Sequence, residues 1–344
     1  MGSQSVSVNR RGLANIAMFS ISGLAAATAA LLAAGANAHG VATALIHWPD
    51  GTFYPGYDPG YQFVHPPPVV IGWSIPDDLN NSYISPSAYA TPDIVCHLGA
   101  TPAGLAAPVN AGDVLEIVWN QWPESHHGPV LDYLANCNGP CETTDKTKLK
   151  FFKIGEAGLL DPAKNYWADD VLRANNLTWS VRLPADIAPG NYVLRHEIIA
   201  LHSAGVPNGA QNYPFCFNLV VHGNGTATPA GIPATSLYTA NGPGIMFNLY
   251  NGSTDYVIPG PPLYSSAMTA AQTKLGFVKA TASGVSSYEP SAAGAAARAV
   301  PTPSVAPAAT GAAATAAPVA AADQPAEPVP TTLLTAVLKV RGKE

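Results

Sequence analysis

Short runs rich in β-branched and aromatic residues, separated by glycine and proline, restrict the fold of this chain more than any other feature. They occupy residues 113–120, 177–184, 191–202 and 212–221, and apolar and polar positions alternate along them. Helical patterning is weak and confined to short stretches such as residues 161–174. Many short strands joined by long loops are typical of two packed sheets. We therefore predict an all-β fold, an immunoglobulin- or fibronectin-like β-sandwich with long loops and short helices.

The first 38 residues have the pattern of a secretory signal peptide. An arginine pair at residues 10 and 11 precedes an apolar, alanine-rich run that ends in Ala36-Asn37-Ala38, a small-x-small cleavage sequence. The alternative is a membrane anchor, because the apolar run approaches spanning length, but no flanking charge follows it. We predict cleavage after Ala38, which makes His39 the first residue of a secreted, extracellular protein.

The rest of the chain divides by composition. Residues 39–265 have the pattern of one globular domain, whereas residues 266–344 are dominated by alanine, proline and threonine and contain no cysteine. Such a composition cannot bury a core, so a disordered tail is predicted. Secreted enzymes that act on solid polysaccharide often carry a linker of this kind before a small binding module. We expect a tail without a carbohydrate-binding module here.

Four cysteines, an even number in an exported chain, favour disulfide bonds. Four cysteines allow three pairings. The short loop between Cys137 and Cys141 contains turn residues and favours a local bridge, which leaves Cys96 to pair with Cys216. A zinc site at the Cys-x-x-x-Cys motif is the alternative, although no second close pair accompanies it.

Four Asn-x-Ser/Thr sequons are candidate N-glycosylation sites if the host is a eukaryote. They begin at Asn80, Asn176, Asn224 and Asn251. Because many sequons occur by chance, we expect only part of them to be occupied, and Asn176 is the one that we predict.

The charge balance narrows the classes of partner. The 344 residues include 16 Lys and Arg against 22 Asp and Glu, a formal net charge of −6. Nucleic acid and anionic membranes select a basic surface, so we expect neither as a partner. A neutral polymer remains compatible with this charge. We also expect a monomer.

Histidines supply the candidate metal ligands. A free N-terminal His39 would offer two nitrogens to one metal, its α-amine and its ring Nδ1. The pKa of an α-amine is about 8, so this group deprotonates at modest cost when it binds a metal. One further imidazole would complete a planar three-nitrogen site, which suits Cu(II) better than tetrahedral zinc. The isolated His47, His65, His97 and His222 are instead expected to be ordinary polar residues.

Further polar residues cluster in three of the strand-like runs. His126 and His127 are adjacent, so on an extended chain they point to opposite sides and at most one faces a given site. Gln211 and Tyr213 are two apart and share a face, whereas Cys216 has the opposite parity. His196 and His202 lie within the run 191–202.

Taken together, these motifs resemble the fungal lytic polysaccharide monooxygenases of auxiliary activity family 9, formerly glycoside hydrolase family 61. The resemblance covers residues 39–265 and is carried by five motifs: HG at the predicted N-terminus, SHHGPVLDYLANC (125–137), NYVLRHEIIALHSAG (191–205), GAQNYPFC (209–216) and YVIPGPPLY (256–264). The family pattern His-x-Gly-Pro corresponds to residues 126–129. The long tail without a binding module is the one departure from the family.

The resemblance implies a role for each motif residue. His39 and His126 would bind one copper ion as a histidine brace, with Tyr213 as the axial ligand. His202 and Gln211 would lie beside the oxygen-binding position. The cysteine pairing that is favoured above also agrees with the family.

The family also implies a flat face around copper that binds crystalline β-1,4-glucan. Aromatic rings on the loops 54–68 and 256–264 would dock sugar rings there, and we expect Tyr61, Phe63 and Tyr256 to do so. The alternative is that these rings pack against loop prolines.

The implied reaction is oxidative cleavage of cellulose with O2 or H2O2 and an external electron donor, either cellobiose dehydrogenase or a small reductant. A hydrolase with a carboxylate pair among Glu116, Asp132, Glu142 and Asp145 is the alternative enzyme. A non-catalytic copper-binding or glucan-binding protein of the same fold is the alternative outside enzymes.

Overall fold

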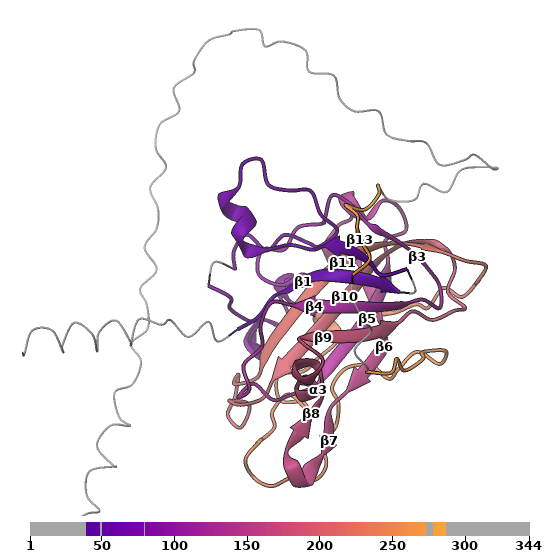
Figure 1. Cartoon of the computed structure of the whole chain (residues 1–344). Helices are drawn as coiled ribbons and strands as arrows, with labels where there is room; N and C mark the ends of the chain where they lie inside the picture. Colours follow the sequence, from indigo (N-terminus) through magenta and orange to yellow (C-terminus); the bar gives the residue numbers. More distant parts are fainter. Residues whose placement is uncertain (1–38, 49, 79, 273–277, 287–344) are drawn as a thin grey trace, which may run out of the picture. The chain divides into compact units, whose positions relative to one another are not determined.

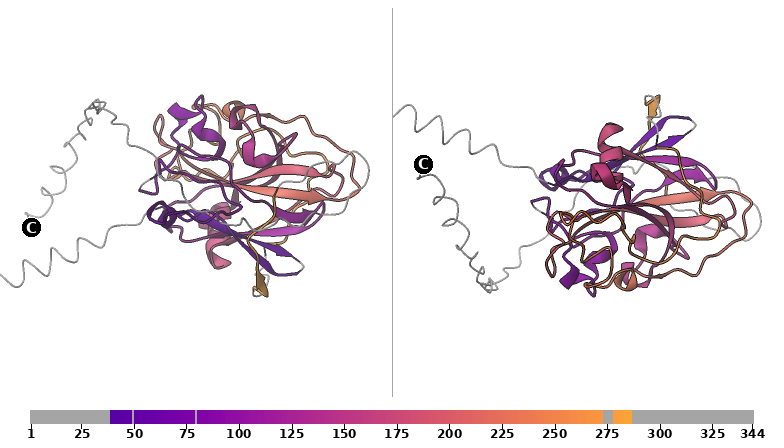
Figure 2. Two further views of the ribbon diagram at one scale, coloured as in Figure 1. Left: turned by 90° about the horizontal axis from the view of Figure 1, so that it is seen from above. Right: turned by 90° about the horizontal axis from the view of Figure 1, so that it is seen from below.

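Two β-sheets that face each other form the body of the protein, and they are visible as separate layers in Figures 1 and 2. The computed structural model describes residues 39–286 except 49, 79 and 273–277. One sheet has the strand order β13-β2-β1-β4-β9, and the other has the order β12-β6-β5-β10-β11-β3. A separate two-stranded sheet is formed by β7 and β8.

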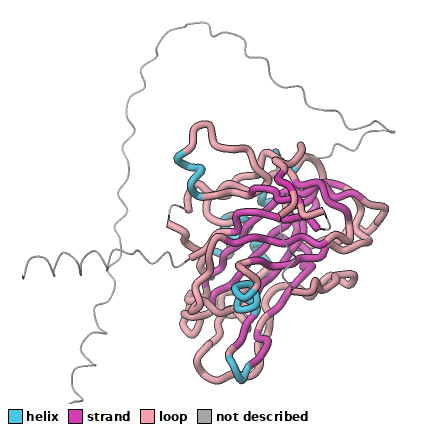
Figure 3. Tube along the Cα trace, in the orientation of Figure 1, coloured by secondary structure: helices cyan, strands magenta, loops and turns pink. Residues whose placement is uncertain are grey.

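The strands are short, and long loops connect them (Figure 3). Their bounds are β1 (Ala42–Trp48), β2 (Thr52–Pro55), β3 (Ala107–Asn110), β4 (Val114–Trp119), β5 (Val130–Asn136), β6 (Lys150–Ala157), β7 (Leu159–Asp161), β8 (Tyr166–Trp167), β9 (Thr178–Arg182), β10 (Gly190–Ala200), β11 (Gln211–His222), β12 (Ile232–Pro233) and β13 (Ala280–Thr281). The predicted all-β sandwich is therefore confirmed.

Helices are few and at most seven residues long in the described part of the chain. The α-helices are α2 (Asp93–Cys96) and α3 (Ala168–Ala174), and the 3-10 turns are η1 (Pro59–Phe63), η2 (Pro86–Ala88), η3 (Cys141–Thr143), η4 (Lys146–Lys148), η5 (Pro162–Lys164) and η6 (Ala234–Ser236). The stretch 161–174 is thus helical mainly in its second half. None of the helices that the structure describes could span a membrane.

The four strand-like runs correspond to β4, β9, β10 and β11, but the last two strands differ from the expected half-buried pattern. Nearly every residue of β10 and β11 is buried on both faces. One face of these strands contributes to the core between the sheets. The other is covered at α2, whose Cys96 is bonded to Cys216 of β11, and at the turn η6. Loop coverage therefore explains why polar side chains on both faces of β10 are buried.

Both predicted disulfide bonds are confirmed. Cys96 pairs with Cys216, and Cys137 pairs with Cys141. Each thiol is thus engaged within the chain, which removes the zinc alternative for the Cys-x-x-x-Cys motif.

Contacts with the β-sandwich continue past the predicted domain boundary at residue 265. Gln272 donates to the main-chain oxygen of Ser180 (2.7 Å) and accepts from its amide (2.9 Å), so one side chain pairs with the outer edge of β9. Farther along, β13 pairs in parallel with β2 at the opposite edge of the same sheet, and Val285 pairs with Ala106. The composition of the tail does not predict these contacts, because they are side-chain and main-chain hydrogen bonds and not the packing of apolar side chains. The remainder of the predicted tail, residues 287–344, lies outside the described residues.

A truncation series tests this boundary. We expect a chain that ends at residue 265 to melt several degrees below the full chain, because each lost hydrogen bond costs about 1 kcal/mol and 1 kcal/mol corresponds to roughly 2–4 °C at this domain size. A chain that ends at residue 286 keeps these bonds and should melt with the full chain. Differential scanning calorimetry on the three lengths makes the comparison. Equal melting temperatures for all three would contradict a stabilising role for residues 266–286.

Candidate metal centre

His39 lies three residues before the start of β1, and hydrogen bonds to its main-chain oxygen hold it in place. The side-chain amide of Gln121 donates to this oxygen (2.6 Å), and the side-chain amide of Asn81 donates to it from another side (3.2 Å). Gly40 packs so closely against Gln121 that a Cβ atom would lie 1.8 Å from the Gln121 carbonyl oxygen. Residue 39 is therefore held against the loop that follows β4.

His126 lies in that loop, between β4 and β5. The indole of Trp122 donates to its main-chain oxygen (3.2 Å), and Ser125 Oγ lies 3.1 Å from its Nδ1. Its Nε2 is buried and has no hydrogen-bond partner. Burial, together with the neighbouring His202 and His39, lowers the pKa of His126 to about 3. The ring is therefore neutral, and in the tautomer with the proton on Nδ1, where Nδ1 donates to Ser125, Nε2 has the free lone pair that a metal ligand requires.

Tyr213 projects from β11 into the same place. Its ring centroid lies 5.4 Å from that of His39, and the His39 and His126 centroids are 5.1 Å apart. The Tyr213 hydroxyl donates to Gln211 Oε1 (2.7 Å), so these two residues do share a face of the strand. Burial raises the pKa of Tyr213, which keeps its hydroxyl protonated.

His202 completes the cluster just beyond the end of β10. Its ring centroid lies 4.0 Å from that of His126, and its Nδ1 is buried without a partner. Burial, and then the nearby His39, lowers the pKa of His202. The structure thus brings together His39, His126, His202, Gln211 and Tyr213 from four separate segments of the chain.

The residues present fit a copper ion. The free Nε2 of His126 and the adjacent imidazole of His39 are nitrogen donors, and the Tyr213 hydroxyl is a weak oxygen donor. In this structure His39 Nδ1 lies 2.6 Å from the carbonyl oxygen of Asn81. Coordination through Nδ1 would exchange that hydrogen bond for the metal. The α-amine depends on cleavage after Ala38, which lies outside the described residues.

The three aromatic residues predicted to dock sugars differ in how exposed and how tightly packed their side chains are. Phe63 is 79% exposed, whereas Tyr61 is half-buried beside Tyr57. The ring of Tyr256 packs against Trp167 and Phe247, and its hydroxyl donates to the Gly244 carbonyl (2.7 Å). Tyr256 thus has a structural role in the loop, and its contact with substrate remains a prediction.

Two further loop aromatic residues, Tyr83 and Tyr250, were not predicted from the sequence. Tyr83 lies 6.0 Å from the His39 ring and 6.2 Å from the Tyr213 ring, measured between centroids. Tyr250 is 73% exposed on the loop before Tyr256. Neither lies in a periodic or motif-bearing run, so only an inspection of every loop aromatic could have selected them.

The carboxylates of the hydrolase alternative have other partners. Asp132 accepts from the Trp179 indole (3.0 Å) and is paired with His196 (2.7 Å), and Glu116 accepts from Trp48 (3.1 Å). Asp145 lies on the surface and accepts from Thr147. These contacts hold the side chains in structural roles.

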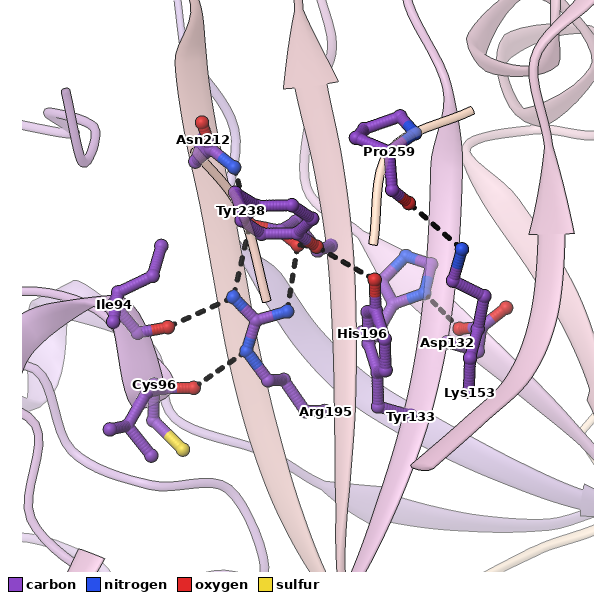
Figure 4. A network of polar contacts seen from close by, with 12 residues as sticks. Ile94, Cys96, Asp132, Tyr133, Lys153, Arg195, His196, Asn212, Tyr238 and Pro259 are labelled. Carbon is purple, nitrogen blue, oxygen red and sulfur yellow. Dashed lines mark hydrogen bonds and ion pairs between the residues drawn. The ribbon is translucent and has the colours of Figure 1, made fainter. Parts of the chain in front are cut away.

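A buried polar network connects β10, β11 and α2 (Figure 4). Arg195 donates to Glu197 (2.7 Å) and to the carbonyl of Ile94 (2.9 Å), which ties β10 to α2. Asn212, which separates Gln211 from Tyr213, donates to the same glutamate (2.8 Å). The network therefore fixes the strand residue between two members of the metal cluster.

All four sequon asparagines are exposed, so each is accessible to modification. Asn176 follows α3 with a left-handed backbone (φ 61°). Its glycosylation remains a prediction.

The fold and this cluster define a class, a β-sandwich protein in which two histidines and a tyrosine that fit a copper ion lie close together. A family model described as "Auxiliary Activity family 9 (formerly GH61)" matches residues 39–256. The chain therefore belongs to auxiliary activity family 9, and it is a copper-dependent polysaccharide monooxygenase.

Individual relatives agree with this family. AA9 family lytic polysaccharide monooxygenase I of Botryotinia fuckeliana is 56% identical over 261 residues, which is 75% of this chain and 96% of that protein. AA9 family lytic polysaccharide monooxygenase cel61A of Hypocrea jecorina is 49% identical over 260 residues, 74% of each chain. The solved structure of the "extended catalytic domain" of H. jecorina LPMO9A is similar with a TM-score of 0.69 and 49% identity, covering 72% of this chain and all of that one.

Proposed function

We propose that the secreted, mature chain binds a single copper ion and cleaves β-1,4-glucan, with cellulose as substrate. The oxidant is O2 or H2O2, and cellobiose dehydrogenase or a small reductant supplies electrons. The observation that carries this proposal is the buried, partner-free Nε2 of His126 beside the rings of His39 and Tyr213. Such an arrangement leaves one neutral imidazole nitrogen directed at a position that other donors surround.

The side chains have distinct roles in this proposal. His39, His126 and Tyr213 hold copper, and copper supplies the one-electron chemistry that activates the oxidant. His202 has a ring nitrogen without a partner, so it can hydrogen-bond the oxidant and move a proton to or from it. Gln211 orients the Tyr213 hydroxyl, which donates to its Oε1, and its amide is assigned to the oxidant.

Product analysis tests the reaction. Mass spectrometry of soluble products from cellulose, with and without ascorbate, should show oxidised oligosaccharides only when reductant and copper are present. The matched control is His126→Ala, which should release none. Products that are not oxidised would indicate hydrolysis. Copper binding without any product would indicate a non-catalytic copper- or glucan-binding protein.

The exposed aromatic residues give a separate prediction about binding. Phe63→Ala should weaken retention on solid cellulose by about fivefold, since an aromatic contact contributes roughly 1 kcal/mol. Its side chain is largely exposed, so the melting temperature should not change. Tyr256→Ala should instead lower the melting temperature, because it removes a ring that packs against Trp167. Pull-down isotherms and calorimetry on both variants separate docking from packing, and unchanged retention for Phe63→Ala would remove it from the substrate surface.

A further inference from the structure

The segment that carries His126 belongs to no strand, so other groups must satisfy its main chain. The Trp122 indole donates to the His126 carbonyl (3.2 Å), and the Leu201 amide donates to the His127 carbonyl (2.9 Å). Gly128 differs from both, because one residue, Asp169, bonds its amide as well as its carbonyl. Asp169 therefore satisfies both main-chain polar groups of one residue in this loop.

Asp169 is fully buried in the first turn of α3. Its Oδ1 accepts from the Gly128 amide (2.9 Å), and its own amide donates to the Gly128 carbonyl (3.4 Å). From the other side, Gly128 packs on β10 so closely that a Cβ atom would lie 1.8 Å from the Ile199 carbonyl oxygen. Gly128 is therefore confined between the helix and the strand, two residues from His126.

His127 strengthens this link to the helix. Its Nδ1 lies 3.2 Å from Asp170 Oδ2 and 3.9 Å from Asp169 Oδ1, so its ring lies beside the first turn of α3. These three side chains are close enough to hold a metal ion of their own. However, the carboxylate oxygens nearest to His127 are already engaged, because Asp169 Oδ1 accepts from the Gly128 amide and Asp170 Oδ2 accepts from the Trp167 amide (2.7 Å). Asp170 Oδ1 accepts from Arg173, and Asp169 Oδ2 is the one carboxylate oxygen of this cluster without a hydrogen-bond partner. The cluster therefore fits a support for the loop better than a second metal site.

We propose that Asp169 is a positioning residue for the copper ligand His126. By fixing Gly128 against β10, it holds residues 126–128 in the one path that leaves His126 Nε2 directed into the site. Without the carboxylate, the buried Gly128 amide loses its acceptor, and the loop must shift to satisfy it. The proposal rests on the copper site proposed above.

The test compares neighbouring carboxylates on the same helical turn. Asp169→Ala should weaken copper binding by about tenfold, the lower end of what loss of a ligand-supporting group costs. It should also change the Cu(II) hyperfine coupling in electron paramagnetic resonance. Asp169→Asn keeps an oxygen acceptor for Gly128 and should restore most of the affinity. Asp170→Ala is the matched control, since it removes the other partner of His127 but no contact to Gly128, and it should leave affinity and spectrum close to wild type.

A metal-free measurement keeps the inference separate from the function. Amide hydrogen exchange at residues 126–128 of the copper-free protein should accelerate in Asp169→Ala and not in Asp170→Ala. If Asp169→Ala does not fold, Asp169→Glu, which keeps the charge but displaces the acceptor, should show the same two effects.

Three results would overturn the inference. The first is wild-type copper affinity and wild-type amide exchange in Asp169→Ala, or in Asp169→Glu if Asp169→Ala does not fold. The second is an equal effect on affinity and exchange in Asp170→Ala, and the third is a second bound copper that is lost in both alanine variants. A wild-type protein that binds no copper would refute the proposed function, while the exchange data would still decide the role of Asp169.

Discussion

One extra residue before His39 in the cleaved chain should weaken copper binding by at least roughly a hundredfold. The added residue converts the α-amine into an amide, which is a poor donor at neutral pH, and the chelate ring with Nδ1 is lost. Loss of a mere supporting group already costs ten- to a hundredfold in metal affinity, so loss of a ligand must cost more. Titration calorimetry with Cu(II) on both forms measures the difference.

The matched control for this experiment is a mature chain with one extra residue at its C-terminus, which should bind copper as the mature chain does. The N-terminally extended form should still fold, because Gln121 and Asn81 hold the carbonyl of His39 in the uncleaved chain. Without copper, it should therefore have the same melting temperature as the mature form. Equal copper affinities for the correctly cleaved and extended forms would remove the α-amine from the ligand set and leave a site of side chains alone.

The second large effect separates His202 from His126. His202→Ala should bind copper nearly as tightly as wild type, because His202 is assigned to the oxidant and not to the metal. Its product yield should fall by about two to three orders of magnitude, which corresponds to the roughly 3–4 kcal/mol that a hydrogen bond to developing charge contributes. His126→Ala removes a ligand and should lose copper affinity as well as products.

Both variants are measured by copper titration, by paramagnetic resonance and by product release in the presence of ascorbate. The expected spectrum of His202→Ala is a modest perturbation of the wild-type signal without a new ligand set. Loss of copper from His202→Ala to the same degree as from His126→Ala would make His202 a ligand. Full activity of His202→Ala would make its place beside His126 purely structural.

The comparison of β10 and β11 with their sequence patterns shows what local signals determine. Period-two alternation located both strands to within two residues. It could not show that the second face is buried, because that burial depends on α2 and η6, which are distant in sequence. The polar residues Arg195 and Glu197 are alternate positions of one strand, and only the packed helix makes them a buried ion pair.

The C-terminal boundary shows the opposite limit. Alanine, proline and threonine indicate an absence of core-forming residues, and the described parts of this segment, residues 266–272 and 278–286, contribute little to the core. Gln272 is nevertheless hydrogen-bonded to β9, and β13 is paired with β2, at the two edges of one sheet. Hydrogen bonds to open sheet edges carry no compositional signature, so the sequence did not predict these contacts beyond residue 265.

For the candidate metal centre, the sequence and its family resemblance predict which residues bind copper. The donor atoms follow from residue type alone in the N-terminal histidine, the His-x-Gly-Pro motif and the Gln-x-Tyr pair. The tertiary structure alone decided how those donors are held. His126 has a free Nε2 because its loop is bonded to Trp122, Leu201 and Asp169, which lie on three separate segments. The donor atoms of a side chain are a property of the single residue and can be predicted from the sequence. The direction of a lone pair depends on contacts that form only when distant segments of the chain pack together.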